Sequence, residues 1–237
     1  MDLPKLLSGL RSTRILDLSQ TLEEHMPHFP THSMFFHNLW GSYWHGGLSL
    51  SYQLVMHEHN GTHVDAPAHF VSDATPSAHI TIDKIPVDRL IGRGVHIDCR
   101  SLQESDYVSR QQIEDWESRH GAIAQRDIVL FDFGWSVRWA LRPRDQPYVE
   151  CWPGVSVEAA EYLISKGAAA LGVDTLSPDP PEALRTNPVH PVVLEKNLLI
   201  IENLTNLGEL PDFFLFLAFP LKIRAGSGSP IRAVALL

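Results

Sequence analysis

The 237-residue chain has an ordinary globular composition, with 44% hydrophobic and 20% charged residues, and is long enough to bury a large core. Its net charge of −9 disfavours nucleic acids and anionic membranes as partners. The two cysteines imply no disulfide framework, and no apolar stretch approaches the roughly 18 residues of a membrane-spanning helix. The first residues lack the apolar core of a signal peptide. We therefore expect a cytoplasmic protein.

Short apolar runs bounded by Gly, Pro or Asp predict eight β-strands. In chain order they cover residues 15–18, 48–56, 95–98, 128–131, 168–172, 198–201, 214–219 and 231–237. The chain shows no internal repeat, low-complexity tract or linker. We expect one α/β domain over residues 1–237.

Two helices are predicted between these strands. Ser109 and Gln112 form a capping-box pattern that opens a helix over about 110–119. Ser156 caps the second helix, VEAAEYLISK, whose Val157, Ala160, Leu163 and Ile164 fall on one face, and Gly167 ends it.

The segment 23–47 is rich in His, aromatic and Gly residues and has no clean periodicity. It predicts a long loop, and such loops in compact domains often serve as binding loops or lids. Its aromatic residues have two interpretations: they pack the loop, or they form an aromatic cradle for a flat substrate. The residues concerned are Phe29, Phe35, Phe36, Trp40 and Trp44.

The run HNGTHVDAPAH (59–69) carries three imidazoles and a carboxylate within eleven residues. On a straight strand His59 and Asp65 would lie roughly 20 Å apart, and on a helix about 240° apart around the axis. The chain must therefore bend and cannot be regular structure. Gly61 gives the freedom for the bend, and Pro67 ends it rigidly. Imidazole nitrogens and carboxylate oxygens are ligands for Zn²⁺, and catalytic sites leave one position open, so we expect a metal here.

Further polar residues follow predicted strands. Asp174, Ser177 and Asp179 lie in VDTLSPDPP after one strand, where they form either a site or simple turns beside the prolines. His190 is held between Pro188 and Pro191. Glu202 continues a buried strand and needs a cation, a hydrogen-bond donor or a metal as partner.

These residues carry a family resemblance. HNGTHVDAPAHF (59–70) resembles the HxGTHxDxPxHF motif of the cyclase-family metal-dependent hydrolases, which include bacterial kynurenine formamidase and isatin hydrolase. The similarity extends to the segments 16–27, 127–135, 153–179 and 228–236, and so to nearly the whole chain.

The resemblance implies a role for each residue. It makes His59, His63 and Asp65 the first metal-ligand set and His69 the catalytic proton shuttle. His190 and Glu202 fit the positions of a second metal. The metal would be Zn²⁺ or Mn²⁺, with one or two ions. The implied fold is α/β with a mixed, barrel-like β core flanked by a few helices, assembled as a homodimer or higher oligomer.

The implied reaction is hydrolysis of an amide, lactam or lactone carbonyl by a metal-activated water, with His69 transferring the proton. Where formamidase-like members carry MPVWPGD, this chain has MPHFPTHS (26–33), so the resemblance implies hydrolysis but does not identify N-formylkynurenine as the substrate. The favoured function is an arylformamidase-like or isatin-hydrolase-like amidohydrolase acting on a small aromatic or cyclic amide. Alternatives are a lactone hydrolase of the same family, a non-haem Fe(II) oxygenase using His63, Asp65 and His190, and a non-catalytic metal-binding protein.

Overall fold

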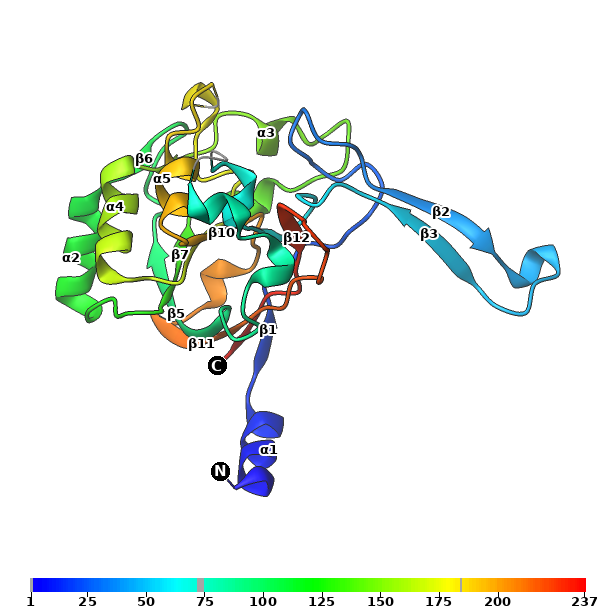
Figure 1. The fold of residues 1–237 in the computed structure, drawn as a ribbon, viewed down its shortest axis with the longest axis horizontal. Helices are drawn as coiled ribbons and strands as arrows, with labels where there is room; N and C mark the ends of the chain where they lie inside the picture. The colour runs from blue at the N-terminus through cyan, green and yellow to red at the C-terminus, as the bar shows by residue number, and fades with distance from the viewer. Residues whose placement is uncertain (1, 72–74, 184) are drawn as a thin grey trace.

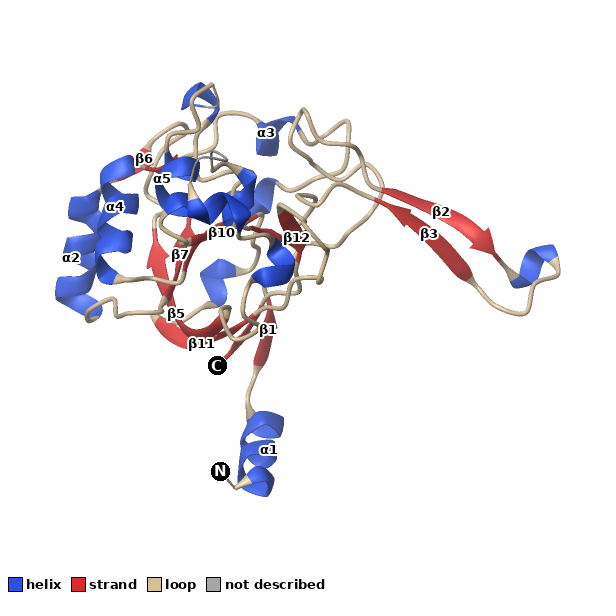
Figure 2. Cartoon of the chain, in the orientation of Figure 1, coloured by secondary structure: helices blue, strands red, loops and turns tan. Residues whose placement is uncertain are grey.

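A nine-stranded mixed sheet organises the chain and curls into a half-barrel (Figures 1 and 2). The computed structural model describes residues 2–71, 75–183 and 185–237. The strand order is β1-β13-β11-β5-β7-β9-β10-β4-β12. The strands are β1 Ile15–Asp17, β4 His63–Asp65, β5 Ile91–Asp98, β7 Ile128–Asp132, β9 Ala170–Val173, β10 Leu199–Glu202, β11 Phe213–Leu217, β12 Gly228–Pro230 and β13 Val234–Leu236.

The centre of the sheet is parallel and its borders are antiparallel. Strands β5, β7, β9 and β10 run parallel, while β4 pairs antiparallel with β10 and with β12. Two small ribbons lie outside it: β2 Phe36–Gly41 with β3 Ser51–Val55, and β6 Tyr107–Val108 with β8 Gly154–Val155. Because β1 pairs with β13, the two ends of the chain meet in one sheet.

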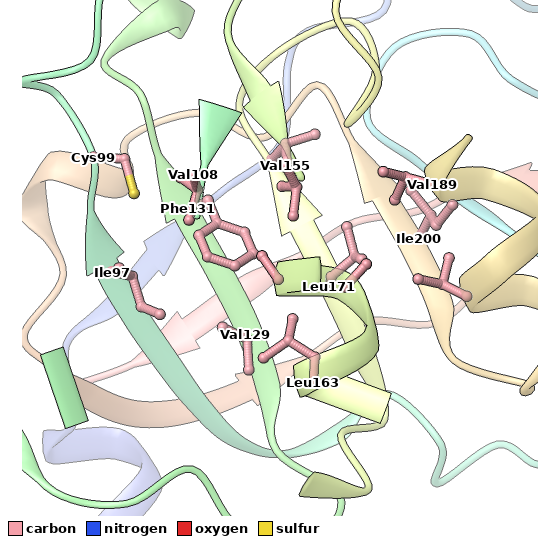
Figure 3. Close-up of a cluster of buried hydrophobic side chains, with 14 of the residues drawn as sticks. Ile97, Cys99, Val108, Val129, Phe131, Val155, Leu163, Leu171, Val189 and Ile200 are labelled. Atoms are coloured by element: carbon pink, nitrogen blue, oxygen red, sulfur yellow. The ribbon is translucent and has the colours of Figure 1, made fainter. Parts of the chain in front are cut away.

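Helices α2 Arg110–His120, α4 Val157–Lys166 and α5 Val189–Glu195 lie together beside the parallel strands (Figure 1). Between helices and sheet lies a hydrophobic cluster in which Phe131 and Leu171 of the sheet face Leu163 of α4 (Figure 3). A second cluster, containing Leu130, Ile201 and Phe216, covers the other face. Each such buried side chain contributes roughly 1.5–3 kcal/mol through its removal from water.

The predicted α/β fold is confirmed, and its elements agree with the sequence pattern. All eight predicted strands overlap observed ones, β3 inside the predicted 48–56. Ser109 and Gln112 form the expected capping box of α2. Ser156 accepts a hydrogen bond from the Ala159 N–H at the start of α4, which Gly167 ends in the left-handed conformation.

The sequence patterns did not predict several short elements. These are α1 Leu3–Ser12, α3 Gln146–Val149, α5, and the strands β2, β4, β6, β8 and β12. The sequence patterns also did not predict the short 3-10 turns, which are Tyr43–His45, Pro67–His69, Pro76–His79, Ile82–Lys84, Trp135–Arg138, Pro181–Ala183 and Leu207–Glu209. Most of the missed strands have two or three residues, too few to show an alternating pattern.

The prediction of a loop over 23–47 is wrong in part. Residues 36–41 form β2, which pairs with β3 in a long hairpin that projects from the body (Figure 1). Most side chains of both strands are exposed, so no face is buried against the body and no period of two marks the sequence.

A buried carboxylate fixes the turn that follows β7. Asp174 is inaccessible to solvent and accepts hydrogen bonds from the backbone N–H groups of Phe133, Trp135 and Ser136, at 3.0, 2.6 and 3.1 Å. Burial and the nearby Asp132 raise the pKa of Asp174 to about 7, although the three donors act in the opposite direction. The interaction ties the ends of β7 and β9 together.

We predict that Asp174→Ala lowers the free energy of unfolding by about 3 kcal/mol or more, because it leaves buried N–H groups without an acceptor. Urea denaturation followed by circular dichroism measures this. Asp88→Ala is the control, since the Asp88 side chain is 61% exposed and pairs with Arg126 on the surface, and it should change the value by less than about 1 kcal/mol. Equal effects of the two variants would contradict the assigned role of Asp174.

Candidate metal centre

The histidine-rich run folds as a turn, a short strand and a 3-10 turn. Gly61 has a φ of +63°, in the left-handed region that favours glycine. Strand β4 then carries His63 and Asp65 to the same side of the sheet, because side chains alternate along a strand. Pro67 starts the 3-10 turn that ends at His69.

The expected bend is therefore present, while the expectation that the whole run is irregular is wrong. His63–Asp65 forms a regular strand because β10 and β12 flank it and bond its backbone on both sides. The bend lies instead on either side of that strand.

Strand register brings the distant carboxylate to this run. Glu202 of β10 lies directly opposite His63 of β4 in the antiparallel pair. The helix α5 begins beside them and presents His190 at its second residue. Segments separated by more than a hundred residues thus meet at one point.

The six residues expected to hold metal or transfer protons all lie together. His63 Nε2 is 3.4 Å from Asp65 Oδ1 and 3.1 Å from Glu202 Oε2. His190 Nε2 is 3.5 Å from Asp65 Oδ2 and 3.4 Å from Glu202 Oε1. Two groups of three could each hold an ion: His63, Asp65 and Glu202, and His59, Asp65 and His69, with ligand atoms within 4.8 Å of one another.

Three buried polar atoms at this point have no hydrogen-bond partner among the described residues. They are His63 Nε2, Asp65 Oδ2 and Glu202 Oε1. Leaving such atoms buried without a hydrogen bond costs about 1–3 kcal/mol each, more when charged. A divalent cation would satisfy all three, so the residues present fit a bound metal ion.

The electrostatics favour positive charge at the same point. Burial alone would lower the pKa of His63, but its interactions with Asp65 and Glu202 raise it to about 10. Burial also opposes ionisation of Asp65, yet the neighbouring His59 and His69 hold the pKa of that carboxyl well below its usual range. A metal ion competes with protons for these groups.

Hydrogen bonds direct one ring nitrogen of each candidate ligand histidine toward the cluster. His63 Nδ1 donates to the Gly61 carbonyl at 2.8 Å, which leaves Nε2 for the ion. His190 Nδ1 donates to Asp179 at 2.6 Å, which leaves its Nε2 likewise. Partners of this kind fix the tautomer and the ring orientation of metal ligands.

His59 is held in the same way through its other nitrogen. Ser227 Oγ donates to Glu58 at 2.8 Å and so accepts from His59 Nε2, 2.9 Å away. His59 Nδ1 then faces Asp65 Oδ1 at 2.6 Å. Gly228 makes room for the ring, since a Cβ there would lie 2.5 Å from His59 Cε1.

His69 lies beside the cluster and lines the adjoining pocket. Its ring stacks on His59 with centroids 3.9 Å apart. Burial lowers the pKa of His69 to about 3; the attraction of Asp65 opposes this, and the neighbouring histidines reinforce it. The ring is therefore neutral at pH 7 and has a nitrogen able to accept a proton.

The pocket above the cluster has a volume of about 260 Å³. Its lining combines two aromatic rings, the candidate ligands and small polar groups: Phe29, Thr31, His32, His59, His69, Phe70, Ser177, Asn187, His190 and Glu202. Aromatic walls with a few polar groups are typical of sites for small molecules.

The aromatic residues of the expected cradle do not all reach this pocket. Phe29 lines it, whereas Phe35 is buried next to His37. Phe36, Trp40 and Trp44 belong to the projecting hairpin and its end, and the structure does not bring them to the pocket of their own chain.

Several residues of the site carried weak sequence signals or none. Asp179 lies in a run that simple turns would explain equally well. In the structure it accepts hydrogen bonds from the N–H groups of Val189 and His190, and it orients the His190 ring. Glu58 and Ser227 act through His59, and a hydrogen-bond relay between distant segments leaves no pattern in one sequence.

Comparison with known proteins identifies the family. The model of the family described as "Putative cyclase" matches residues 16–180. The chain belongs to the cyclase family. The expected family is thus confirmed.

Relatives in the cyclase family include an isatin hydrolase from Roseibium aggregatum, 34% identical over 78% of this chain and 73% of the relative. A kynurenine formamidase from Erythrobacter litoralis is 30% identical over 93% of each chain. Isatin hydrolase A from Ralstonia solanacearum superposes with a TM-score of 0.91 at 30% identity, covering 100% of this chain and 97% of that structure. These relatives confirm the expectation that the chain is a metal-dependent hydrolase acting on C–N bonds.

We predict that Glu202→Gln weakens metal binding, because it removes a buried carboxylate that faces His63 and His190. Isothermal titration of the metal-free protein with Zn²⁺ and Mn²⁺ measures the affinity. Glu195→Gln on the exposed side of α5 is the control and should bind as the wild type does. Unchanged affinity for both ions in Glu202→Gln would exclude this residue as a ligand.

Asp179→Asn should weaken binding by a factor of about 10–100, because Asp179 orients His190 without facing the cluster itself. The same titration tests this. An effect as large as that of Glu202→Gln would indicate that Asp179 binds the ion directly.

Proposed function

We propose that this cyclase-family protein hydrolyses the C–N bond of a small aryl formamide or cyclic amide. The observation that carries the proposal is the set of buried atoms without a hydrogen bond on His63, Asp65 and Glu202. Glu202 and His69 also line the adjoining pocket, whose walls include two phenylalanine rings. Relatives named isatin hydrolase and kynurenine formamidase support the substrate class, since both names describe amide hydrolysis.

In this proposal His59, His63, Asp65, His190 and Glu202 hold one or two ions of Zn²⁺ or Mn²⁺. Such an ion polarises a carbonyl group and lowers the pKa of water to about 7. Asp65 belongs to both possible ligand groups, which suits a carboxylate because it offers two oxygens.

His69 is the proposed proton carrier. Its neutral ring accepts a proton from the attacking water and delivers it to the leaving nitrogen, so that the amine leaves uncharged. Stacking on His59 holds the imidazole at the pocket wall. Phe29 and Phe70 offer apolar walls against which a flat aromatic substrate can lie.

The alternatives use the cluster less completely. An Fe(II) oxygenase with His63, Asp65 and His190 as ligands leaves Glu202, His59 and His69 without a role. A structural ion needs neither an adjoining pocket nor a neutral histidine beside it. A lactone hydrolase of the same family would share all these features, and only its substrate would distinguish it from an amide hydrolase.

We further propose that residues 1–237 form one domain, that the protein acts in the cytoplasm and that it is a homo-oligomer. The pairing of β1 with β13 supports a single domain. Among the described residues, no helix is both long and apolar enough to cross a membrane.

We predict that His69→Asn lowers kcat by a factor of about 10²–10⁴ while the bound metal is retained, because the proton carrier is lost and the ligands are kept. Steady-state kinetics and metal analysis of the same preparation measure both quantities. His79→Asn, a change at an exposed histidine, should behave as the wild type. If His69→Asn lost its metal in parallel with its activity, His69 would be a ligand instead.

Metal-loaded protein should cleave an aryl formamide or a cyclic amide, and a chelator should abolish the reaction until Zn²⁺ or Mn²⁺ is restored. A panel of N-formylkynurenine, isatin and an aromatic lactone, followed by absorbance, tests the substrate class. Cleavage of the lactone alone would favour the lactonase. Turnover that requires O₂ and Fe(II) would overturn hydrolysis.

A further inference from the structure

Asn203 lies directly after Glu202, at the point where β10 ends. It is buried, with 2% of the residue exposed, and its backbone φ is +57°. This left-handed conformation cannot continue an extended strand, so the chain leaves the sheet immediately after the candidate ligand Glu202. Asparagine tolerates this conformation, and glycine adopts it with less strain still. The backbone turn alone therefore does not require the amide group of Asn203.

The amide group of Asn203 joins two segments that lie far apart in the sequence. Its Nδ2 donates a hydrogen bond to the Gly61 carbonyl at 3.0 Å, and its Oδ1 accepts one from the Tyr148 hydroxyl at 2.8 Å. Reversing the amide would bring two oxygens together at Gly61, so these partners fix its orientation. The buried amide is therefore paired on both sides, as the burial of a polar group requires.

The Gly61 carbonyl is the acceptor that orients the His63 ring. It accepts from His63 Nδ1 at 2.8 Å and from Asn203 Nδ2 at 3.0 Å. A carbonyl oxygen has two lone pairs, and these two donors occupy both. Because glycine has the greatest backbone freedom of all residues, its carbonyl needs an external tie to keep one direction. The Asn203 amide supplies that tie and so acts on His63 through Gly61.

The backbone of Asn203 is held by two further residues. Its N–H donates to the Thr175 carbonyl at 3.0 Å, and its carbonyl accepts from Thr62 Oγ1 at 2.6 Å. Each of the four polar atoms of Asn203 thus forms a hydrogen bond. Thr62 directly precedes His63, so Asn203 ties the end of its own strand to the start of β4.

Tyr148 holds the Asn203 amide from the opposite side. It lies in α3, is completely inaccessible to solvent and belongs to the hydrophobic cluster between the helices and the sheet. Its ring packs edge-on against Trp139 with centroids 4.9 Å apart, and its carbonyl accepts from Trp135 Nε1 at 2.9 Å. Its hydroxyl also lies 3.2 Å from the Asp174 carbonyl. A side chain packed in this way offers its hydroxyl at a fixed position.

A second asparagine, Asn206, has the same conformation in a different place. Its φ is +59°, and its Nδ2 also donates to a backbone carbonyl, that of Asp17, at 2.8 Å. Asn206 is exposed, and Asp17 belongs to β1, at the opposite end of the strand order from β4. Asn206 therefore matches Asn203 in conformation and in type of hydrogen bond, but it does not act on the candidate ligands.

We propose that Asn203 is a positioning residue for the metal centre. It fixes the Gly61 carbonyl and thereby keeps Nε2 of His63 beside the Glu202 carboxylate, 3.1 Å away, where both can hold one ion. Tyr148 supports the amide from the core. The inference rests on the proposed function in that His63 and Glu202 are taken as ligands. Asn203 does not line the pocket described above and acts only through its neighbours.

Asn203→Gly tests the role of the amide, because glycine keeps the left-handed backbone and removes only the side chain. Isothermal titration of the metal-free protein with Zn²⁺ and Mn²⁺ should show affinities weakened by a factor of about 10–100, the usual effect of losing a group that orients a ligand. Asn206→Gly makes the same change at the matched asparagine and should bind both ions as the wild type does.

The visible absorption of bound Co²⁺ gives a readout that does not depend on affinity. Its bands report the number and arrangement of the ligand atoms. A displaced His63 ring should therefore shift them in Asn203→Gly at saturating Co²⁺, whereas Asn206→Gly should give the wild-type spectrum.

A variant in the hydrophobic core separates positioning from overall stability. Leu163→Ala removes a completely buried side chain of α4 that faces the sheet (Figure 3), and it should lower the urea midpoint of unfolding at least as far as Asn203→Gly does. Its affinity for Zn²⁺ should stay at the wild-type value. Equal losses of affinity in Leu163→Ala and Asn203→Gly would show that Asn203 acts through overall stability and would overturn the inference.

Tyr148→Phe removes only the hydroxyl and keeps the packed ring. It should weaken the affinity for Zn²⁺ by a factor of about 2–10, the effect of losing one hydrogen bond. Adding it to Asn203→Gly should cause no further loss, because the hydroxyl acts through the amide. Tyr162→Phe is the control: it removes a hydroxyl that donates to Glu117 and should bind Zn²⁺ as the wild type does. If Asn203→Gly does not fold, wild-type affinity in Tyr148→Phe would overturn the inference.

The outcomes separate the positioning role from the proposed function. Wild-type affinity and an unchanged Co²⁺ spectrum in Asn203→Gly, or fully additive losses in the double variant, would overturn the positioning role and leave the proposed function standing. Weakened binding in Asn203→Gly, together with a wild type that cleaves no amide, would support the positioning role and overturn the proposed hydrolysis. A wild type that binds neither Zn²⁺ nor Mn²⁺ would overturn both.

Discussion

The pairing of β4 with β10 is the constraint on which the site depends. It sets Glu202 opposite His63, and the alternation along β4 places Asp65 on the same side. A shift of one residue in this register would turn Glu202 to the other face of the sheet. The antiparallel border of the sheet therefore determines where two buried carboxylates meet.

The surrounding residues keep this charged cluster in one arrangement. Asp179 is held by the start of α5 and in turn holds His190, and Glu58 does the same for His59 through Ser227. These contacts join the cluster to the hydrophobic core, because α5 packs on the sheet through Val193 and Leu194. The positions of the candidate ligand nitrogens are thus linked to elements that pack in the core.

Much of this could be predicted from the sequence, because the signals are local. Capping boxes, buried apolar strands and the glycine of the bend each follow from a few neighbouring residues, as at Ser109 and Gly61. The hairpin was missed because β2 is exposed on both faces and so shows no alternation. Asp179 and Ser227 were not assigned their roles because these depend on contacts with segments far along the chain.

The proposed ligands come from the run 59–69 and from residues 190 and 202, and more than a hundred residues of chain separate the first stretch from the other two. A bound ion would link these stretches to one another. Metal binding and folding of this edge of the sheet would then be coupled, so that free metal shifts the population toward the folded form. The concentration of free metal would then determine the stability of β4 in the sheet as well as the rate of the reaction.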